Sequence, residues 1–314
     1  MDNLTHSLVG AVLGQAGLKR TTGLAMHALI IGANLPDLDA ACFFWLEGTE
    51  HLAFRRGITH GPPALVLLPL ILAGLLWAFD RWQTKRGTRP EARLPVRFGW
   101  LYAMAFIGCL SHPFFDWLNV YGIRLLEPFS SQWFYGDTLF IIDVWLWAVL
   151  IASVWVSRRR ENAGAEWMLP ARVGIIFALV YIGLNYWRTD NLYGGVIIEE
   201  PYDKFIVSPT PLASWGREVI IGRAGSQRFE WGADVEWPPL ERANISFCSF
   251  PDLTALRRTN SQLDAFLFWS RAPFATRAAD GSVILYDARF YDPRARGRFS
   301  VALPDVRCEE LTQP

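Results

Sequence analysis

The sequence has no excess of charge of either sign, few cysteines and an N-terminus that does not resemble a cleavable signal peptide. Its 314 residues carry 30 Lys and Arg against 30 Asp and Glu, so nothing indicates a nucleic-acid partner. The first ten residues, MDNLTHSLVG, lack the basic stretch of a signal peptide. A thiolate zinc site is disfavoured because no Cys-x-x-Cys pair occurs among the four cysteines, Cys42, Cys109, Cys248 and Cys308.

Long apolar runs are what the sequence does have, and hydrophobic residues make up 52% of it. Each long run is close to the roughly 20 residues that a bilayer requires. These runs lie at 61–79, 98–118, 138–157 and 171–187. Two shorter runs, 4–18 and 22–35, reach only about 20 Å as helices. They are either short spans or helices packed inside the bundle, and we favour short spans.

The character of the sequence changes near residue 190. Pro, Gly and Arg become frequent, and segments such as REVIIGR and SVILYDARFY alternate apolar and polar residues. This pattern is typical of short strands joined by turns. The sequence therefore predicts an α-helical membrane bundle of about six helices at 1–189, followed by a smaller β-rich soluble domain at 190–314.

The distribution of Lys and Arg among the loops predicts the orientation in the cytoplasmic (inner) membrane. Basic residues concentrate in 19–22, 80–97 and 158–172, whereas 36–60 and 119–137 carry fewer. By the positive-inside rule the first three loops face the cytoplasm. The N-terminus, the other two loops and the C-terminal domain then face the outer, periplasmic side.

This orientation has a consequence for two cysteines. Cys248 and Cys308 both lie in the C-terminal domain. An outer location is oxidising, so a disulfide between them is possible, whereas a cytoplasmic domain would disfavour it.

Acidic and histidine residues of the apolar part gather at the predicted outer face. Residues with purely structural roles would be expected at both faces. Ionisable groups within a membrane are costly, so such a cluster indicates a functional site. The cluster consists of His6, Asp37, Asp39, His60, His112, Asp116 and, about one turn inside the 138–157 run, Asp143.

The chemistry of these residues fits a metal ion. His112 and Asp116 are four positions apart, so they project from one helical face and can bind the same ion. Asp37 and Asp39 could bridge neighbouring ions, or serve as a ligand and a base. A metal ion would also supply an acidic water as a nucleophile.

Several of these residues also have a structural interpretation, including His60, which stands alone before Gly-Pro-Pro. His112 could be a hydrogen-bonded helix histidine and Asp116 a cap, and NLPDLD could be a helix stop followed by a turn. Two further histidines are interpreted structurally only: we expect His27 to pack in the core and His51 to be solvated in the outer loop.

Several segments resemble a known family in order and spacing. These are MDNLTHSLVGAVLG, NLPDLD, RRGITHGP, HPFFDWLNVYG and PFSSQWFYGDTLFIIDVWLW. Over about residues 1–150 they resemble the bacterial membrane-bound metal-dependent hydrolases of the YdjM/YfhP-like group. That group is thought to be distantly similar to zinc-dependent phospholipase C and P1-type nucleases. The resemblance implies a helical core with a multi-zinc site that cleaves phosphoesters.

The resemblance also implies roles for individual residues. Asp39 would be a ligand or a supporting carboxylate, and Asp143 matches a family acid whose role is not defined. The metal ligands implied are His6, Asp37, His60, His112 and Asp116.

One position departs from the family pattern. Arg55 stands where the family usually has a histidine, which would weaken or remove one metal. His51 could substitute for that histidine. Alternatively, Arg55 and Arg56 could clamp a phosphate, or simply face lipid head groups.

These observations favour a membrane-bound, metal-dependent hydrolase, most fittingly with Zn²⁺, that acts on a phosphoester such as a lipid head group. Asp37 or Asp39 would manage the proton of the attacking water, and Arg56 would hold the substrate. The alternative is a non-catalytic membrane protein with a structural metal site and a β-rich tail that binds a partner. An ion-coupled transporter ranks last because no inverted repeat is visible.

Overall fold

The computed structural model describes residues 1–195, 201–213, 215–224, 227–233, 245–292 and 296–311. The chain divides into two compact units. The first comprises Met1–Asp39 and Arg56–Arg188, and the second Ala40–Arg55 and Thr189–Pro314. Residues 40–55 therefore leave the helical unit and pack in the second one, which the sequence did not indicate.

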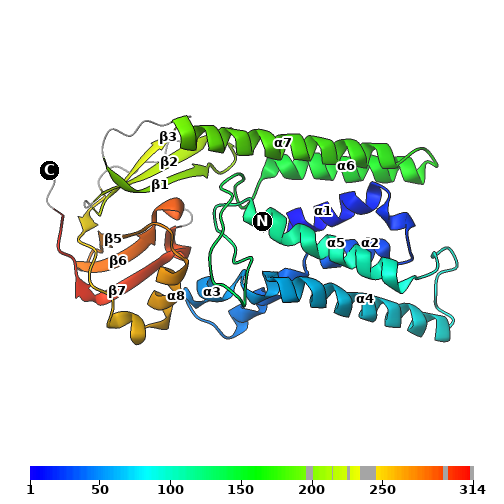
Figure 1. The fold of residues 1–314 in the computed structure, drawn as a ribbon, viewed down its shortest axis with the longest axis horizontal. Coiled ribbons are helices and arrows are strands. Elements are labelled where there is room, and N and C mark those ends of the chain that lie inside the picture. The colour runs from blue at the N-terminus through cyan, green and yellow to red at the C-terminus, as the bar shows by residue number, and fades with distance from the viewer. Residues whose placement is uncertain (196–200, 214, 225–226, 234–244, 293–295, 312–314) are drawn as a thin grey trace. The chain divides into compact units, whose positions relative to one another are not determined.

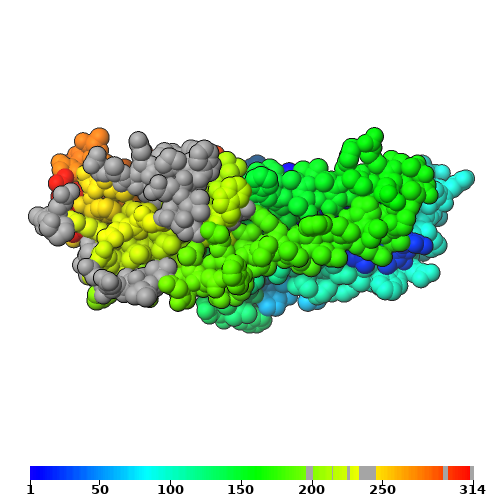
Figure 2. All heavy atoms as spheres, turned by 90° about the horizontal axis from the view of Figure 1, so that it is seen from above, coloured from blue at the N-terminus to red at the C-terminus, as the bar shows by residue number. Residues whose placement is uncertain are grey.

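The first unit is helical (Figure 1). Within it α5 packs against α2 and α4, and α1 packs against α2 and α6. Helices α6 and α7 run side by side, and their side chains cover the face of this unit seen in Figure 2. The α-helices are α1 (Asn3–Gln15), α2 (Ala25–Gly32), α4 (Pro62–Lys85), α5 (Phe98–Trp117), α6 (Val144–Asn162) and α7 (Met168–Gly195). The 3₁₀ helices are η1 (Leu18–Arg20), η2 (Leu35–Phe44) and η3 (Ile58–His60).

Among the described residues, three helices are long and apolar enough to cross a membrane: α4, α5 and α7. These match three of the expected long runs. The run 138–157 differs, because its helix α6 begins only at Val144. The Asp143 carboxylate accepts hydrogen bonds from the amides of Trp145 and Leu146, so this residue caps α6. The expectation that Asp143 lies one turn inside a span was therefore wrong.

Glycines let α1, α2 and α5 approach closely. A Cβ on Gly108 of α5 would lie 2.4 Å from the Leu29 carbonyl oxygen of α2. A Cβ on Gly32 would lie 2.6 Å from the Ala105 carbonyl oxygen in the same interface. Small residues at helix contacts allow this approach in membrane bundles. The close contact sets the position of α5 relative to the end of α2, where two site residues follow.

The second unit contains two antiparallel sheets, ordered β1-β2-β3 and β4-β5-β6-β7. They share one apolar core, in which Ile206 lies opposite Ile220 and Phe229 meets Phe274. A helical region followed by a β-rich region is thus confirmed. The strands are β1 (Tyr202–Pro209), β2 (Arg217–Arg223), β3 (Phe229–Ala233), β4 (Phe247–Cys248), β5 (Pro273–Arg277), β6 (Ser282–Asp287) and β7 (Ser300–Arg307).

Residues 40–55 join this unit through their own helix, α3 (Glu50–Phe54), which packs against α8 (Ser261–Trp269). The Thr49 hydroxyl donates to the Gln262 carbonyl over 2.8 Å. Ser261 donates to the Glu50 carboxylate. The unit also contains the short turns η4 (Leu256–Arg258), η5 (Ala288–Phe290) and η6 (Arg296–Arg298).

A disulfide joins Cys248 at the end of β4 to Cys308 just after β7, with their Cα atoms 5.3 Å apart. It links residues 60 positions apart in the chain. The other two cysteines, Cys42 and Cys109, are buried and are not in a disulfide. The pairing that the sequence left open is therefore present in the structure.

Thiol counting tests this disulfide. Denatured protein purified without reductant should react with two equivalents of a thiol reagent, and with four after reduction, since Cys42 and Cys109 are outside the disulfide. Cys308→Ser should expose Cys248, so the unreduced variant should show three. Four reactive thiols in unreduced wild-type protein would contradict the disulfide and would argue against the predicted outer, oxidising location.

Candidate metal centre

Three buried histidines meet at the end of the helical unit. His6 lies in the first turns of α1, which begins where the Asp2 carboxylate accepts from the amides of Leu4 and Thr5. His60 ends η3, and His112 lies one turn before the end of α5. All three side chains are fully buried.

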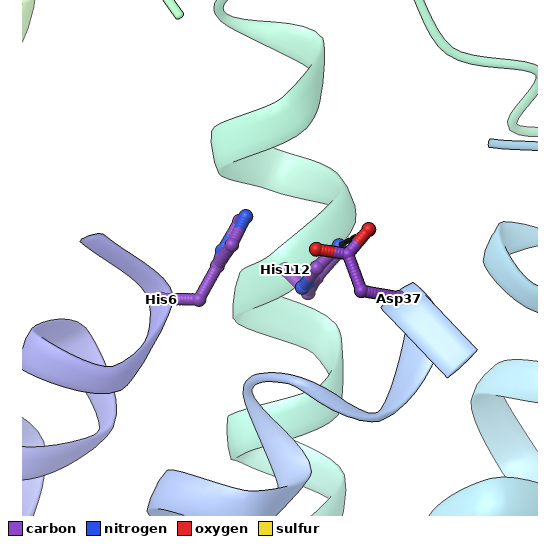
Figure 3. Close-up of side chains that lie close together, drawn as sticks. All are labelled: His6, Asp37 and His112. Atoms are coloured by element: carbon purple, nitrogen blue, oxygen red, sulfur yellow. Dashed lines mark ion pairs between the residues drawn. The ribbon is translucent and has the colours of Figure 1, made fainter. Parts of the chain in front are cut away.

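The rings of His6 and His112 stack, with centroids 3.7 Å apart and planes inclined by 18°. Figure 3 shows His6 on one side of His112 and Asp37 on the other, each from a different segment. The His60 ring meets His112 edge-on at 5.0 Å. His112 therefore contacts both of the other imidazoles, although the three residues come from distant parts of the chain.

Two carboxylates face these rings. An Asp116 oxygen lies 3.6 Å from Nε2 of His112 and 3.5 Å from Nε2 of His60, and its other oxygen lies 3.4 Å from Nε2 of His6. Oδ1 of Asp37 lies 3.8 Å from Nε2 of His112. Asp116 is thus the carboxylate on which all three histidines converge.

Two sets of residues have ligand atoms close enough to hold a metal ion. The first is His6, Asp37 and His112, and the second is His60, His112 and Asp116; within each set the ligand atoms lie within 4.8 Å of one another. His112 belongs to both sets. Only Nε2 of His112 faces the other ligand atoms, and one nitrogen can bind one ion. His112 can therefore serve one of the two sets at a time.

Hydrogen bonds fix which nitrogen His112 offers. Its Nδ1 lies 2.7 Å from the Ala33 carbonyl oxygen, just beyond the end of α2. A carbonyl oxygen only accepts, so Nδ1 must carry the proton. In the neutral ring Nε2 then has a free lone pair, which a metal ion requires.

The Thr59 hydroxyl links His60 to Asp39, and this relay fixes which nitrogen His60 offers. Thr59 Oγ1 donates to Asp39 Oδ2 over 3.2 Å, so it can accept from His60 Nδ1, which is 2.9 Å away. Nε2 of His60 is then left as the lone pair facing Asp116. Outer partners of this kind orient metal-binding histidines.

Several buried nitrogens at this site have no hydrogen-bond partner among the described residues. They are Nδ1 and Nε2 of His6, Nε2 of His60 and Nε2 of His112. Unpaired buried polar atoms cost free energy and are rare in native proteins. A cation held by either set would pair Nε2 of His112 and one ring nitrogen of His6 or His60, so the residues fit a metal ion.

Asp39 and Arg56 support the ligands. The Arg56 amide donates to Asp39 Oδ2 over 2.7 Å, and the Arg56 guanidinium lies with Nε 2.9 Å from Asp116 Oδ2. Neither metal set includes Asp39. Arg56 also donates to Asn119 Oδ1 over 2.9 Å. The α-amino group of Met1 contacts the other Asp116 oxygen, so a guanidinium and an amine face the two oxygens of this buried carboxylate.

The other residues considered from sequence lie elsewhere. Arg55 and His51 belong to the second unit, where Arg55 lies over the Phe43 ring and Nδ1 of His51 is 2.8 Å from the Gly48 carbonyl oxygen. Neither is in a metal set. The expectation that His27 packs in the core was wrong, because its side chain is exposed on α2.

Sequence reasoning missed the supporting groups. Thr59 stands directly before His60, and Asn119 follows Asp116 by three positions, so their proximity along the chain was a usable signal. The Ala33 carbonyl is a main-chain atom and has no signal in residue identity.

Comparisons with known proteins give a family for the part of the chain that contains the helical unit. The family model for the YdjM inner membrane protein matches residues 1–192. YfhP of Bacillus subtilis (strain 168), described as uncharacterized, is 23% identical over 315 aligned residues, covering 95% of this chain and 88% of its own. No solved structure matches the chain. The family match covers more than half of the sequence, and the chain belongs to the YdjM inner membrane protein family.

Proposed function

We propose that this protein is a membrane-embedded, metal-dependent hydrolase of phosphoesters. The observation that carries the proposal is the convergence of three buried imidazoles, with free Nε2 atoms, on buried carboxylates. A purely structural cluster would be expected to pair these nitrogens with protein donors or acceptors. Nitrogen and carboxylate ligands without sulfur suit Zn²⁺, which we take as the metal.

The ion would be held by His112 together with either His6 and Asp37 or His60 and Asp116. Bound there, it would act as a Lewis acid and make a water molecule acidic enough to lose its proton near neutral pH. Asp37 is the proton acceptor we favour. It is the least buried of the carboxylates at this site, with 9% of its surface exposed, so it lies nearest to solvent.

Asp39 and Arg56 have positioning roles in this proposal. Asp39 is already bonded by the Arg56 amide and Thr59, and these bonds hold the His60 ring through the relay. Arg56 fixes Asp116 through Nε, which keeps that carboxylate oriented toward the histidines. That Arg56 also binds the substrate phosphate stays a prediction.

The position of the site favours a lipid phosphoester. His112 and Asp116 lie in the last turns of α5, a helix long and apolar enough to span a membrane. A site at the end of a span lies where head groups and water meet. The distribution of basic loops and the Cys248–Cys308 disulfide support an outer location.

A non-catalytic role is the second candidate, and the placement of Arg55 favours it. The residue standing where the family usually has a histidine lies in the second unit and contributes no ligand. The site would then hold a structural ion. The β-rich unit would bind the partner.

Metal content tests the site itself. Detergent-purified protein supplied with zinc and then freed of excess should retain stoichiometric metal. His112→Gln should lose it, because His112 belongs to both sets. His6→Gln and His60→Gln should differ, and the variant that loses metal identifies the set that is filled. His27→Gln is the matched control, since His27 is exposed outside the site.

Two outcomes of that measurement would contradict the proposal. One is a folded wild-type protein that retains no metal. The other is a His112→Gln variant that keeps as much metal as the wild type.

Thr59→Val tests the relay to His60. The substitution keeps the shape of the side chain but removes the hydroxyl that links His60 Nδ1 to Asp39. If the ion occupies the His60 set, zinc affinity should fall by about 10- to 100-fold, measured by competition with a fluorescent chelator. Thr21→Val in the turn at the far end of α1 is the control. An unchanged affinity in a protein whose metal depends on His60 would contradict the relay.

Hydrolysis separates the enzyme from the structural-ion alternative. Vesicles containing the reconstituted protein should release a phosphorylated or dephosphorylated head group from phospholipid. Chelation should abolish the release and zinc should restore it. A protein that binds zinc stoichiometrically yet hydrolyses none of a panel of phospholipids and soluble phosphodiesters would favour the structural role.

A further inference from the structure

A second surface, independent of the metal centre, lies in residues 40–55. Four aromatic side chains there are exposed, and we name them the aromatic tip: Phe43 (54%), Phe44 (91%), Trp45 (59%) and Phe54 (47%). Phe44 in particular buries almost none of its ring. Such a patch marks an interaction site rather than ordinary surface.

Side chains of the aromatic tip contact one another or the neighbouring Arg55. Trp45 and Phe54 meet edge-on with centroids 6.1 Å apart. The Arg55 guanidinium lies 5.6 Å above the Phe43 ring. Beneath them Cys42 and Leu52 are fully buried, so the segment is fixed to its unit on one side and presents aromatics on the other.

The chain restricts where the aromatic tip can be. Phe54 is eight residues before Pro62, where the candidate membrane span α4 begins. Eight residues extend at most about 28 Å. The tip therefore stays near the membrane end of α4, whatever the arrangement of the two units.

We propose that the aromatic tip inserts into the interfacial layer of the bilayer at the end where α4 begins. The partner is the lipid surface itself. Aromatic side chains, Trp above all, are enriched at membrane interfaces, and an apolar face there is buried among head groups and upper acyl chains.

The insertion would give the β-rich unit a second attachment to the membrane. Thr49 and Glu50, next to the tip, are bonded to Gln262 and Ser261 of α8. The unit would thus be tethered by α7 at its start and by the inserted tip through α3. This inference does not depend on the metal or on hydrolysis.

Site-directed fluorescence in the full-length protein tests the insertion. Phe44→Cys carries an environment-sensitive NBD label, and Ala302→Cys on the exposed side of β7 carries the same label as the matched control. Wild-type protein measures background labelling, because Cys42 and Cys109 are buried and the other two cysteines are paired. The proteins are reconstituted in phosphatidylcholine–phosphatidylglycerol vesicles.

The emission of the label at position 44 should be blue-shifted relative to the label at 302. Lipids with a nitroxide near the head group should quench it. Aqueous iodide should quench it several-fold less than the label at 302. Iodide quenching equal to that at 302 would overturn the proposal. Protection from both quenchers would also overturn it, because the tip would then be covered by protein. Phe44 is almost fully exposed, so its replacement removes no core contact.

Discussion

The geometry of the metal centre depends on how the nitrogens of its buried imidazoles are hydrogen-bonded. The Nδ1–H of His112 donates a hydrogen bond to the Ala33 carbonyl oxygen just beyond α2, and its Nε2 faces Asp116. His60 does the same through Thr59 and Asp39. Both histidines therefore present lone pairs to one small volume. A cation there would pair those nitrogens and offset the charge of the carboxylates.

The packing of the bundle produces this arrangement. Gly32 and Gly108 let α2 and α5 touch backbone to backbone, which brings the Ala33 carbonyl within reach of His112. The chain then turns directly into η2, which carries Asp37 back over the same histidine. The Arg56 backbone and side chain tie Asp39 and Asp116 together from the next segment.

Much of this could be predicted from sequence, because hydrophobic length and helical spacing are local properties. Three of the long runs became helices of spanning length, and His112 and Asp116 lie one turn apart as their spacing requires. The start of α6 was missed because the apolar run continues through the capping Asp143. Composition alone did not distinguish the exposed His27 from a core residue, since its neighbours along the chain are apolar.

The parts that could not be predicted depend on tertiary contacts. No sequence pattern in residues 40–55 predicts that they pack against α8, and the tautomer of His112 is set by a main-chain atom distant in sequence.

The central claim is that Nε2 of His112 is free to bind a metal ion, and zinc K-edge X-ray absorption of the zinc-loaded protein tests it most directly. The account predicts a shell of nitrogen and oxygen at about 2.0–2.1 Å with imidazole scattering and no sulfur. A sulfur shell at about 2.3 Å, or a zinc ion without imidazole ligands, would contradict it.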